Sequence, residues 1–181
     1  MTTVRIALLA LGWLAVVGAA ARAQTLSVSA DVPVAYTFSE EGFQDASPSG
    51  AMVGLTLPLL LGLGLEGYTV RGSLADPLGA RQPFTYDVTM LEVFLDLPFP
   101  GANLRLGGGV GQGQFALDRA PGAYRAATLT QVFVQAGVPW GGIFDVHMGY
   151  HVIQGRAQSA GTAGTLPLGA AMATAGLKMG F

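Results

Sequence analysis

The stretch that decides the fold is residues 26–38, LSVSADVPVAYTF. Apolar side chains occupy every second position, from Leu26 through Val32 to Phe38, and mostly small or polar residues stand between them. This alternation predicts a β-strand with one apolar face, because successive side chains of a strand point to opposite sides. Pro33 has no N–H to donate to a neighbouring strand, so we predict a bulge or a gap in pairing at that position.

The same alternation recurs seven more times along the chain. The further predicted strands lie at about residues 51–57, 63–71, 84–97, 104–114, 126–138 and 143–153, with the last one leading to residue 181. Polar segments 39–50, 72–83, 115–125 and 154–165 are predicted as long loops, and the segments 58–62, 98–103 and 139–142 as short turns. Alternating long and short connections place both ends of the strand array on the side of the short turns.

The composition narrows the class of protein. Only 11% of the residues are charged, against roughly 25% in ordinary soluble domains. Hydrophobic residues make up 51% and the mean hydropathy is +0.48. Without cysteine there is no disulfide framework, and a net charge of −2 provides no basic surface for nucleic acid. Such a chain is either an unusually apolar soluble β-protein or a membrane barrel.

The N-terminal residues 1–23, MTTVRIALLALGWLAVVGAAARA, have the pattern of a secretory signal peptide. Arg5 precedes an apolar run from Ile6 to Ala21, and Ala21-Arg22-Ala23 is a small-x-small cleavage pattern. The alternative is a retained membrane anchor, but that would need about 20 apolar residues. We therefore predict a cleaved signal peptide over residues 1–23 and one barrel domain over residues 24–181.

Charge density indicates which strand face is outside. A soluble lipocalin-like barrel would turn its apolar face inward. The polar faces carry only about one charge per strand, however, whereas a water-facing surface carries roughly 25–35% charged residues. We therefore expect apolar faces to contact lipid and polar faces to line the lumen. The aromatic residues then predict two interfacial girdles, although Tyr68 shares the inward phase of its strand. The first girdle, near the short turns, has Phe99, Trp140, Phe144 and Phe181, and the second, near the long loops, has Tyr36, Phe38, Tyr68, Phe84, Tyr86 and Tyr150.

A glycine-rich segment, GGGVGQG at residues 107–113, lies within the fifth predicted strand. Glycine lowers strand propensity. It also leaves room for large side chains from the neighbouring strands, and we expect those side chains to fill the space.

The C-terminal strand carries a second recognisable pattern. Ala175, Leu177, Met179 and the terminal Phe181 alternate with small or polar residues, and this resembles the C-terminal assembly signal of outer-membrane barrels. With the export signal, the strand count and the loop asymmetry, the chain resembles the small eight-stranded bacterial outer-membrane β-barrel proteins, which have OmpA-like membrane-domain architecture. The resemblance lies in architecture, so no functional residues are transferred from it.

This resemblance implies an all-β fold, an eight-stranded antiparallel up-and-down transmembrane β-barrel in a bacterial outer membrane. The implied partners are membrane lipid and, during biogenesis, the barrel-assembly machinery. An extended strand with a free edge can be captured by β-augmentation, with pockets for alternate side chains.

The inward faces collect ionisable residues that must be paired or hydrated. Asp96 and Arg105 flank one short turn at matching distances, and Asp145 and Lys178 lie on adjacent strands at similar depth. We predict a salt-bridge network that fills the lumen. Because acids outnumber Arg and Lys, the alternative is a proton or ion path. The predicted lumen residues are Asp31, Glu66, Glu92, Asp96, Arg105, Asp145, His147, His151 and Lys178.

The histidines provide little evidence for a metal site or for catalysis. Four strand residues separate His147 from His151 by about 13 Å, too far for both to bind one zinc ion, so no metal or other cofactor is expected. Asp145 and His147 could orient a general base, and some small outer-membrane barrels are lipid-modifying enzymes. Of the possible nucleophiles nearby, serine is absent and the last strand has only Thr174, so we do not expect an enzyme.

The predicted function follows from the width of the barrel. An eight-stranded barrel has an interior just wide enough for its own side chains, which excludes a wide general porin. We expect an integral outer-membrane protein with a structural envelope role or a narrow small-solute passage. The alternatives are a lipid-modifying barrel enzyme and a soluble periplasmic lipocalin-like binding barrel.

Overall fold

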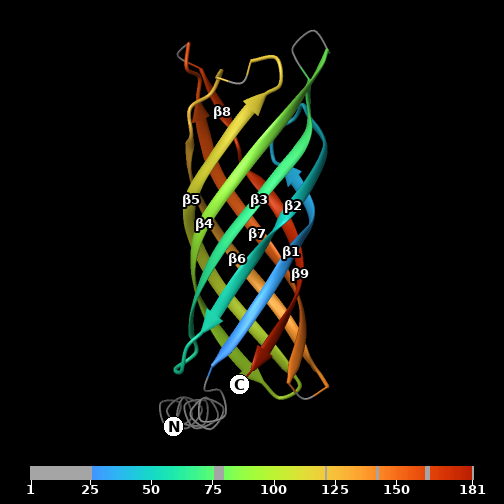
Figure 1. The fold of residues 1–181 in the computed structure, drawn as a ribbon, viewed down its shortest axis with the longest axis vertical. Coiled ribbons are helices and arrows are strands. Elements are labelled where there is room, and N and C mark those ends of the chain that lie inside the picture. The colour runs from blue at the N-terminus through green and yellow to red at the C-terminus, as the bar shows by residue number, and fades with distance from the viewer. Residues whose placement is uncertain (1–25, 76–79, 121, 142, 162–163, 181) are drawn as a thin grey trace, which may run out of the picture.

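The computed structural model describes residues 26–75, 80–120, 122–141, 143–161 and 164–180, and it shows a closed barrel of antiparallel strands (Figure 1). The predicted signal peptide, residues 1–23, lies outside the described residues, as does Phe181. Within the described ranges, no helix is long and apolar enough to cross a membrane.

The strands follow one another around the barrel in chain order. Each pairs with its sequence neighbour from β1 to β7, and β9 pairs with both β7 and β1, which closes the cylinder. The short β8 pairs with β7 just beyond β9, so β8 and β9 are two pieces of one barrel strand. The eight-stranded antiparallel barrel is therefore confirmed. The bounds are β1 Ser27–Phe38, β2 Phe43–Thr56, β3 Leu61–Ala75, β4 Arg81–Phe99, β5 Ala102–Leu117, β6 Ala127–Trp140, β7 Phe144–Gln158, β8 Thr165–Pro167 and β9 Ala170–Gly180.

The strands are longer than the sequence predicts, and the loops are correspondingly shorter. β2 begins at Phe43, inside the predicted loop 39–50, and β7 continues to Gln158, inside the predicted loop 154–165. These polar segments pair in register with their neighbours, as Phe43 does with Leu74. These polar residues stay in strands because their backbone N–H and C=O groups pair with those of the neighbouring strands.

Ser27 stands opposite Gly180, so the first and last described residues lie at the short-turn end of the barrel, at the bottom of Figure 1.

A bulge follows Pro33, as predicted. The pairing of β1 with β9 shifts register between Pro33 and Ala35. Val34 and Ala35 are consecutive and both exposed, and from Tyr36 onward the alternation has the opposite phase. A one-residue slip moves every later side chain to the other face of the strand. Tyr36 and Phe38 therefore point into the barrel.

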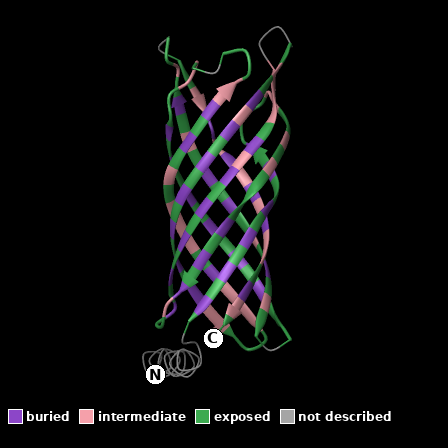
Figure 2. Cartoon of the chain, viewed as in Figure 1, coloured by how far each residue is buried: buried purple, intermediate pink, exposed green. Residues whose placement is uncertain are grey.

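In the half of the barrel next to the short turns, the apolar residues face outward. We call this the membrane half, and it is defined by the outward side chains of Leu63, Leu91, Val132 and Met148, which are 51%, 64%, 64% and 65% exposed. Their strand neighbours Glu92 and Gln131 are buried inside. Buried and exposed residues alternate along the strands (Figure 2). The predicted lipid-facing orientation is confirmed for this half.

In the other half, which we call the loop half, the arrangement is reversed. Phe84, Tyr86 and Phe115 are buried inside, while Asp87 and Gln114 face outward. The predicted girdle near the long loops is therefore wrong for Tyr36, Phe38, Phe84 and Tyr86, which all point inward. Tyr68 also points inward, as its strand phase predicts, and of the six residues only Tyr150 lies on the exterior. The reason is strand length. β4 has 19 residues, whereas about 9–11 suffice to cross a bilayer, and the part beyond the bilayer needs a polar exterior.

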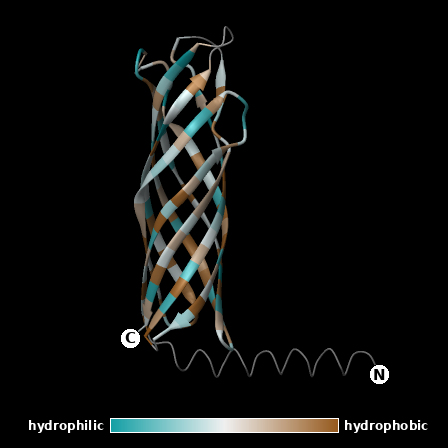
Figure 3. Ribbon diagram, turned by 90° about the vertical axis from the view of Figure 1, so that its right-hand side faces the viewer, coloured by the Kyte–Doolittle hydropathy of each residue, from teal (hydrophilic) through white to brown (hydrophobic). Residues whose placement is uncertain are grey.

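The girdle at the short turns has the predicted outward position. Trp140 is 68% exposed, and Phe99 and Phe144 are 37% and 38% exposed. Figure 3 shows hydrophobic and hydrophilic residues alternating along the strands of both halves.

Candidate functional site

The lumen of the membrane half contains an ion-pair layer centred on Asp96. Its Oδ2 accepts hydrogen bonds from Arg105 at 3.1 Å and from Lys178 at 3.0 Å. Thr56 donates to the same oxygen at 2.9 Å. All four residues are buried, and they come from β2, β4, β5 and β9. Asp96 and Arg105 are direct cross-strand partners in the hairpin of β4 and β5.

Arg105 extends this layer across the barrel. Its Nη1 donates to Ser29 at 2.9 Å and to Gln135 at 3.2 Å, and its guanidinium lies 4.0 Å from the centre of the Phe94 ring. Gly107 leaves room for the neighbouring ring of Phe133, because a Cβ at Gly107 would stand 2.8 Å from Phe133 Cε1 and 2.7 Å from the Cβ of Phe94. The glycine-rich segment does accommodate large side chains from its neighbours.

The layer continues through two further acids on the inner wall. Asp145 lies 3.6 Å from Lys178 Nζ and accepts a hydrogen bond from Asn103 at 2.6 Å. His147 Nε2 lies 2.6 Å from Asp31 Oδ1. The partner of His147 is thus Asp31 from β1 rather than the Asp145 that sequence spacing suggested.

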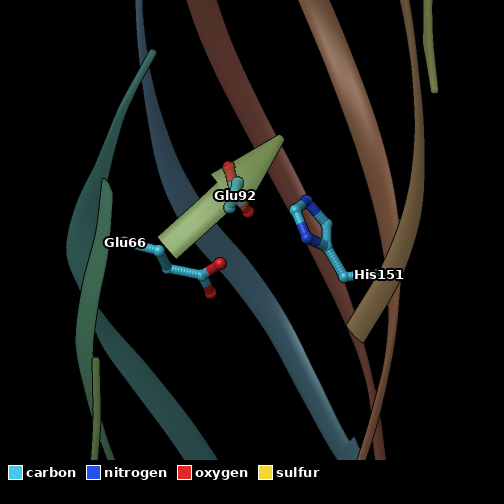
Figure 4. Close-up of side chains that lie close together, drawn as sticks. All are labelled: Glu66, Glu92 and His151. Carbon is cyan, nitrogen blue, oxygen red and sulfur yellow. The ribbon is translucent and has the colours of Figure 1, made fainter. Parts of the chain in front are cut away.

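A second group of polar side chains occupies the middle of the lumen. Glu66 on β3, Glu92 on β4 and His151 on β7 converge there (Figure 4). Gln131 Nε2 donates to Glu66 at 2.7 Å and to Glu92 at 2.5 Å. The His151 ring stacks on Phe133 at 4.9 Å between centroids, and its Nε2 lies 3.4 Å from Thr174 Oγ1.

The loop half is filled by aromatic rings. We call this group the aromatic plug. Phe38 and Phe43 stack at 3.9 Å between centroids, and Phe84 stacks on Phe115 at 5.1 Å. Further edge-to-face contacts join the two pairs, a geometry that aromatic rings favour. The plug consists of Tyr36, Phe38, Phe43, Tyr68, Phe84, Tyr86 and Phe115.

All nine predicted lumen residues lie on the inner wall, in two groups. Asp31, Asp96, Arg105, Asp145, His147 and Lys178 lie in the ion-pair layer, and Glu66, Glu92 and His151 lie in the central group. Sequence reasoning missed the neutral partners Ser29, Thr56, Asn103, Gln131, Gln135 and Thr174. Their signal was present in the strand phase. Ser29, Asn103 and Thr174 share a strand face with the predicted lumen residues Asp31, Arg105 and Lys178. Thr56, Gln131 and Gln135 alternate with exposed apolar residues of β2 and β6.

The predicted assembly-signal residues lie in β9, apart from Phe181, which falls outside the described residues. Leu177 is 49% exposed on the barrel exterior, and Ala175 and Met179 are partly buried. β9 is hydrogen-bonded to β1 on one side and to β7 on the other.

The ion-pair layer leaves little free space. A cavity of about 20 Å³ is lined by Asp96, Asn103, Arg105, Gln135, Asp145 and Lys178, among others. One water molecule needs about 10–15 Å³, so this cavity has room for about one. It cannot hold an organic substrate.

Comparison with solved structures identifies the fold. Neisserial surface protein A, from Neisseria, superposes with a TM-score of 0.52 at 12% identity, covering 86% of this chain and 97% of that one. Ail, the attachment invasion locus protein of Yersinia pestis, gives a TM-score of 0.50 at 15% identity, with 86% and 99% covered. No protein-family model and no curated protein matches the sequence.

The predicted fold is confirmed as that of the small eight-stranded outer-membrane barrels. The apolar exterior of the membrane half requires lipid contact, and together with the fold it supports the predicted location in a bacterial outer membrane.

Proposed function

We propose that this protein is a closed structural element of the outer membrane, without a conducting path and without catalytic activity. The observation that carries the proposal is the occupation of the lumen at three successive heights. The ion-pair layer, the central polar group and the aromatic plug follow one another between the short turns and the loops.

The ion-pair layer works as a brace across the barrel. Its hydrogen bonds and ion pairs join β1, β2, β4, β5, β6, β7 and β9. Charged groups that are fully paired in a low-dielectric interior hold one another in fixed positions. An ion entering from the short turns would have to separate Asp96 from Arg105 and Lys178, and breaking a buried pair costs about 3–5 kcal/mol.

The aromatic plug supports the same conclusion from the other end. A polar solute entering between the loops would meet the packed rings of the plug, four of which are phenylalanines without a hydrogen-bonding group. The absence of catalysis is part of the proposal. Thr174 and His151, which could act as nucleophile and base, are both fully buried between the ion-pair layer and the plug. A lipid acyl chain outside the barrel has no route to them.

Planar-bilayer recording of the refolded protein tests the proposal. We expect no stable unitary currents from the wild type. The double variant Phe84→Ala/Arg105→Ala should conduct, because it removes bulk from both barriers. Thr89→Ala, on the exterior of β4, is the matched control and should behave as the wild type. Stable wild-type currents would instead support the small-solute passage.

The soluble lipocalin-like alternative has a separate test. Monomeric soluble proteins rarely expose apolar patches beyond a few hundred Å², and the membrane half exposes leucine and valine on β1 to β7 and on β9. We expect the protein to enter the detergent phase quantitatively. Recovery in the aqueous phase without surfactant would contradict a membrane location.

We further propose that Ala175, Leu177 and Met179 form part of the segment that the barrel-assembly machinery reads. The support is their alternation and the outward position of Leu177 in β9. Leu177→Asp should reduce the amount of folded barrel in cells, while refolding into detergent should be much less affected. Equal losses in both settings would point to a stability defect instead.

A further inference from the structure

Glu66, Glu92 and His151 form a cluster that the closed-barrel role does not explain. One ligand atom from each lies within 4.8 Å of the ligand atoms of the other two. All three side chains are buried, and they reach the same part of the lumen from three different strands (Figure 4).

The charges of the ion-pair layer and of this cluster differ. In the ion-pair layer, the carboxylates of Asp96 and Asp145 face the cationic groups of Arg105 and Lys178, and Asp31 is paired with His147. In the cluster, the hydrogen-bond donor to both glutamates is the neutral amide of Gln131. Two buried carboxylates that meet at one amide need a cation or protons to offset their charge.

Two polar atoms of the cluster and one of its neighbour Gln131 are unsatisfied. Glu66 Oε1, Gln131 Oε1 and His151 Nδ1 are buried and have no hydrogen-bond partner among the described residues. Glu66 and His151 are completely buried. Each atom can offer a lone pair, and leaving such an atom unpaired costs about 1–3 kcal/mol. A positively charged ligand held by Glu66 and His151 would satisfy the atoms of these two residues.

We propose that this cluster binds one divalent transition-metal cation of the zinc class, with Glu66, Glu92 and His151 as ligands. Imidazole together with carboxylates suits such ions, and two carboxylates balance the charge of the ion. Three protein ligands leave a fourth tetrahedral position open. The site is independent of conduction, so it goes beyond the closed-barrel role.

To bind the ion, the ligand atoms of the cluster must move closer together. Ligands around a tetrahedral zinc at about 2.1 Å lie about 3.4 Å apart, compared with the 4.8 Å limit of the cluster. Carboxylate torsions can supply the difference. Gly64 provides the space, because a Cβ there would stand 2.6 Å from Glu92 Oε2.

The surroundings orient the imidazole for this role. Phe133 stacks on the His151 ring. Thr174 Oγ1 can accept a hydrogen bond from Nε2–H, and in that tautomer the lone pair is on Nδ1. Metal-bound histidines usually donate their other ring N–H in this way. The ion-pair layer and the plug cover the site on both sides, so the ion would enter while the barrel folds.

Metal content after refolding tests the proposal. The protein is refolded into detergent with or without Zn²⁺, desalted, and assayed by inductively coupled plasma mass spectrometry. We expect about one zinc per wild-type barrel refolded with zinc, and at least a tenfold lower content in Glu66→Gln and His151→Ala. His147→Gln is the matched control, because it removes the other histidine but keeps a hydrogen-bond donor for Asp31, and it should retain the metal.

X-ray absorption of the zinc-loaded wild type covers the case in which the variants fail to fold. One nitrogen ligand with oxygen ligands supports the site, and two histidine ligands would overturn it. Wild-type barrels that take up no zinc would also overturn it, showing that the carboxylates hold protons instead. The proposal also fails if folded His151→Ala retains the wild-type zinc content.

Discussion

On β4, Leu91, Val93 and Leu95 face outward beside buried Glu92 and Asp96, whereas further up the same strand Phe84 and Tyr86 face inward and Asp87 faces outward. The strand geometry does not change between these regions, because β4 alternates without a bulge. What changes is the type of residue on each face. At the adjacent apolar pair Met90–Leu91, the outward residues change from polar to apolar, and polar residues appear on the inward face. The outward residues of the strand match the medium around them. They are apolar on the short-turn side of this pair, where lipid surrounds the barrel, and polar on the loop side, where water does.

β1 reaches the same arrangement by another route. Its apolar alternation continues unchanged in sequence from Leu26 to Phe38. The bulge after Pro33 changes the geometry instead and turns Tyr36 and Phe38 into the lumen. Both strands supply the aromatic plug, one by a change of sequence pattern and the other by a change of register. Charged side chains fill one half and aromatic rings fill the other. Substitutions should therefore reduce stability through lost charge pairing in the first half and through lost packing in the second.

The largest effect is expected in the ion-pair layer. Asp96→Ala removes the carboxylate that pairs with both Arg105 and Lys178 and leaves two buried cations without it. We expect a loss of about 4 kcal/mol in the free energy of unfolding, measured by urea titration in lipid vesicles with Trp140 fluorescence. Thr56→Val, which removes one hydrogen bond to the same oxygen, should cost about 1 kcal/mol. Equal effects would mean that the ion pairs contribute little.

The matching change in the loop half should be smaller and independent of salt. Phe84→Ala empties part of the aromatic plug, and we expect a loss of about 3 kcal/mol, at the low end for such truncations because the plug lies near the loops. The same urea titration, repeated at high salt, measures it. A loss that varied strongly with salt would show that charges rather than packing hold this half.

The sequence was sufficient for the strand count, the antiparallel order and the lipid-facing side of the membrane half. It also contained more than we inferred. Phe84 and Tyr86 share the strand phase of Glu92 and Asp96, so their inward position could have been predicted. Tyr36 and Phe38 could not, because a proline indicates a bulge but not how far the register shifts beyond it.

The candidate site shows a sharper limit. Strand phase places Glu66, Glu92 and His151 on the inner wall, but phase specifies a face and not a height. Their meeting depends on the tilt of β3, β4 and β7 and on contact across the lumen. Asp96 and Arg105 were predictable as a pair because a short turn fixes their register. The partner of His147 was not, because Asp31 lies on a different strand, at a distance of 116 residues in the chain.

Two arginine substitutions on the outward face of β4, one in each half of the barrel, test where the lipid ends. Leu95 is 49% exposed in the membrane half, and Leu95→Arg should lower the free energy of unfolding in vesicles by about 2.5 kcal/mol. Thr89→Arg, on the same face of β4 in the loop half, should change it by less than about 0.5 kcal/mol. If Thr89→Arg were as costly as Leu95→Arg, lipid would cover both halves and the division would be wrong.

The smallest effect is expected on the exterior of the loop half. Thr69 Oγ1 donates a hydrogen bond of 2.6 Å to the exposed Asp87. Thr69→Ala should cost less than about 0.5 kcal/mol in the vesicle titration, because water replaces the lost donor. In lipid, the same change would leave a carboxylate without its partner and would cost several times more. A loss above about 2 kcal/mol would therefore place this surface in the membrane, whereas a negligible loss means that β3 and β4 stand in water here.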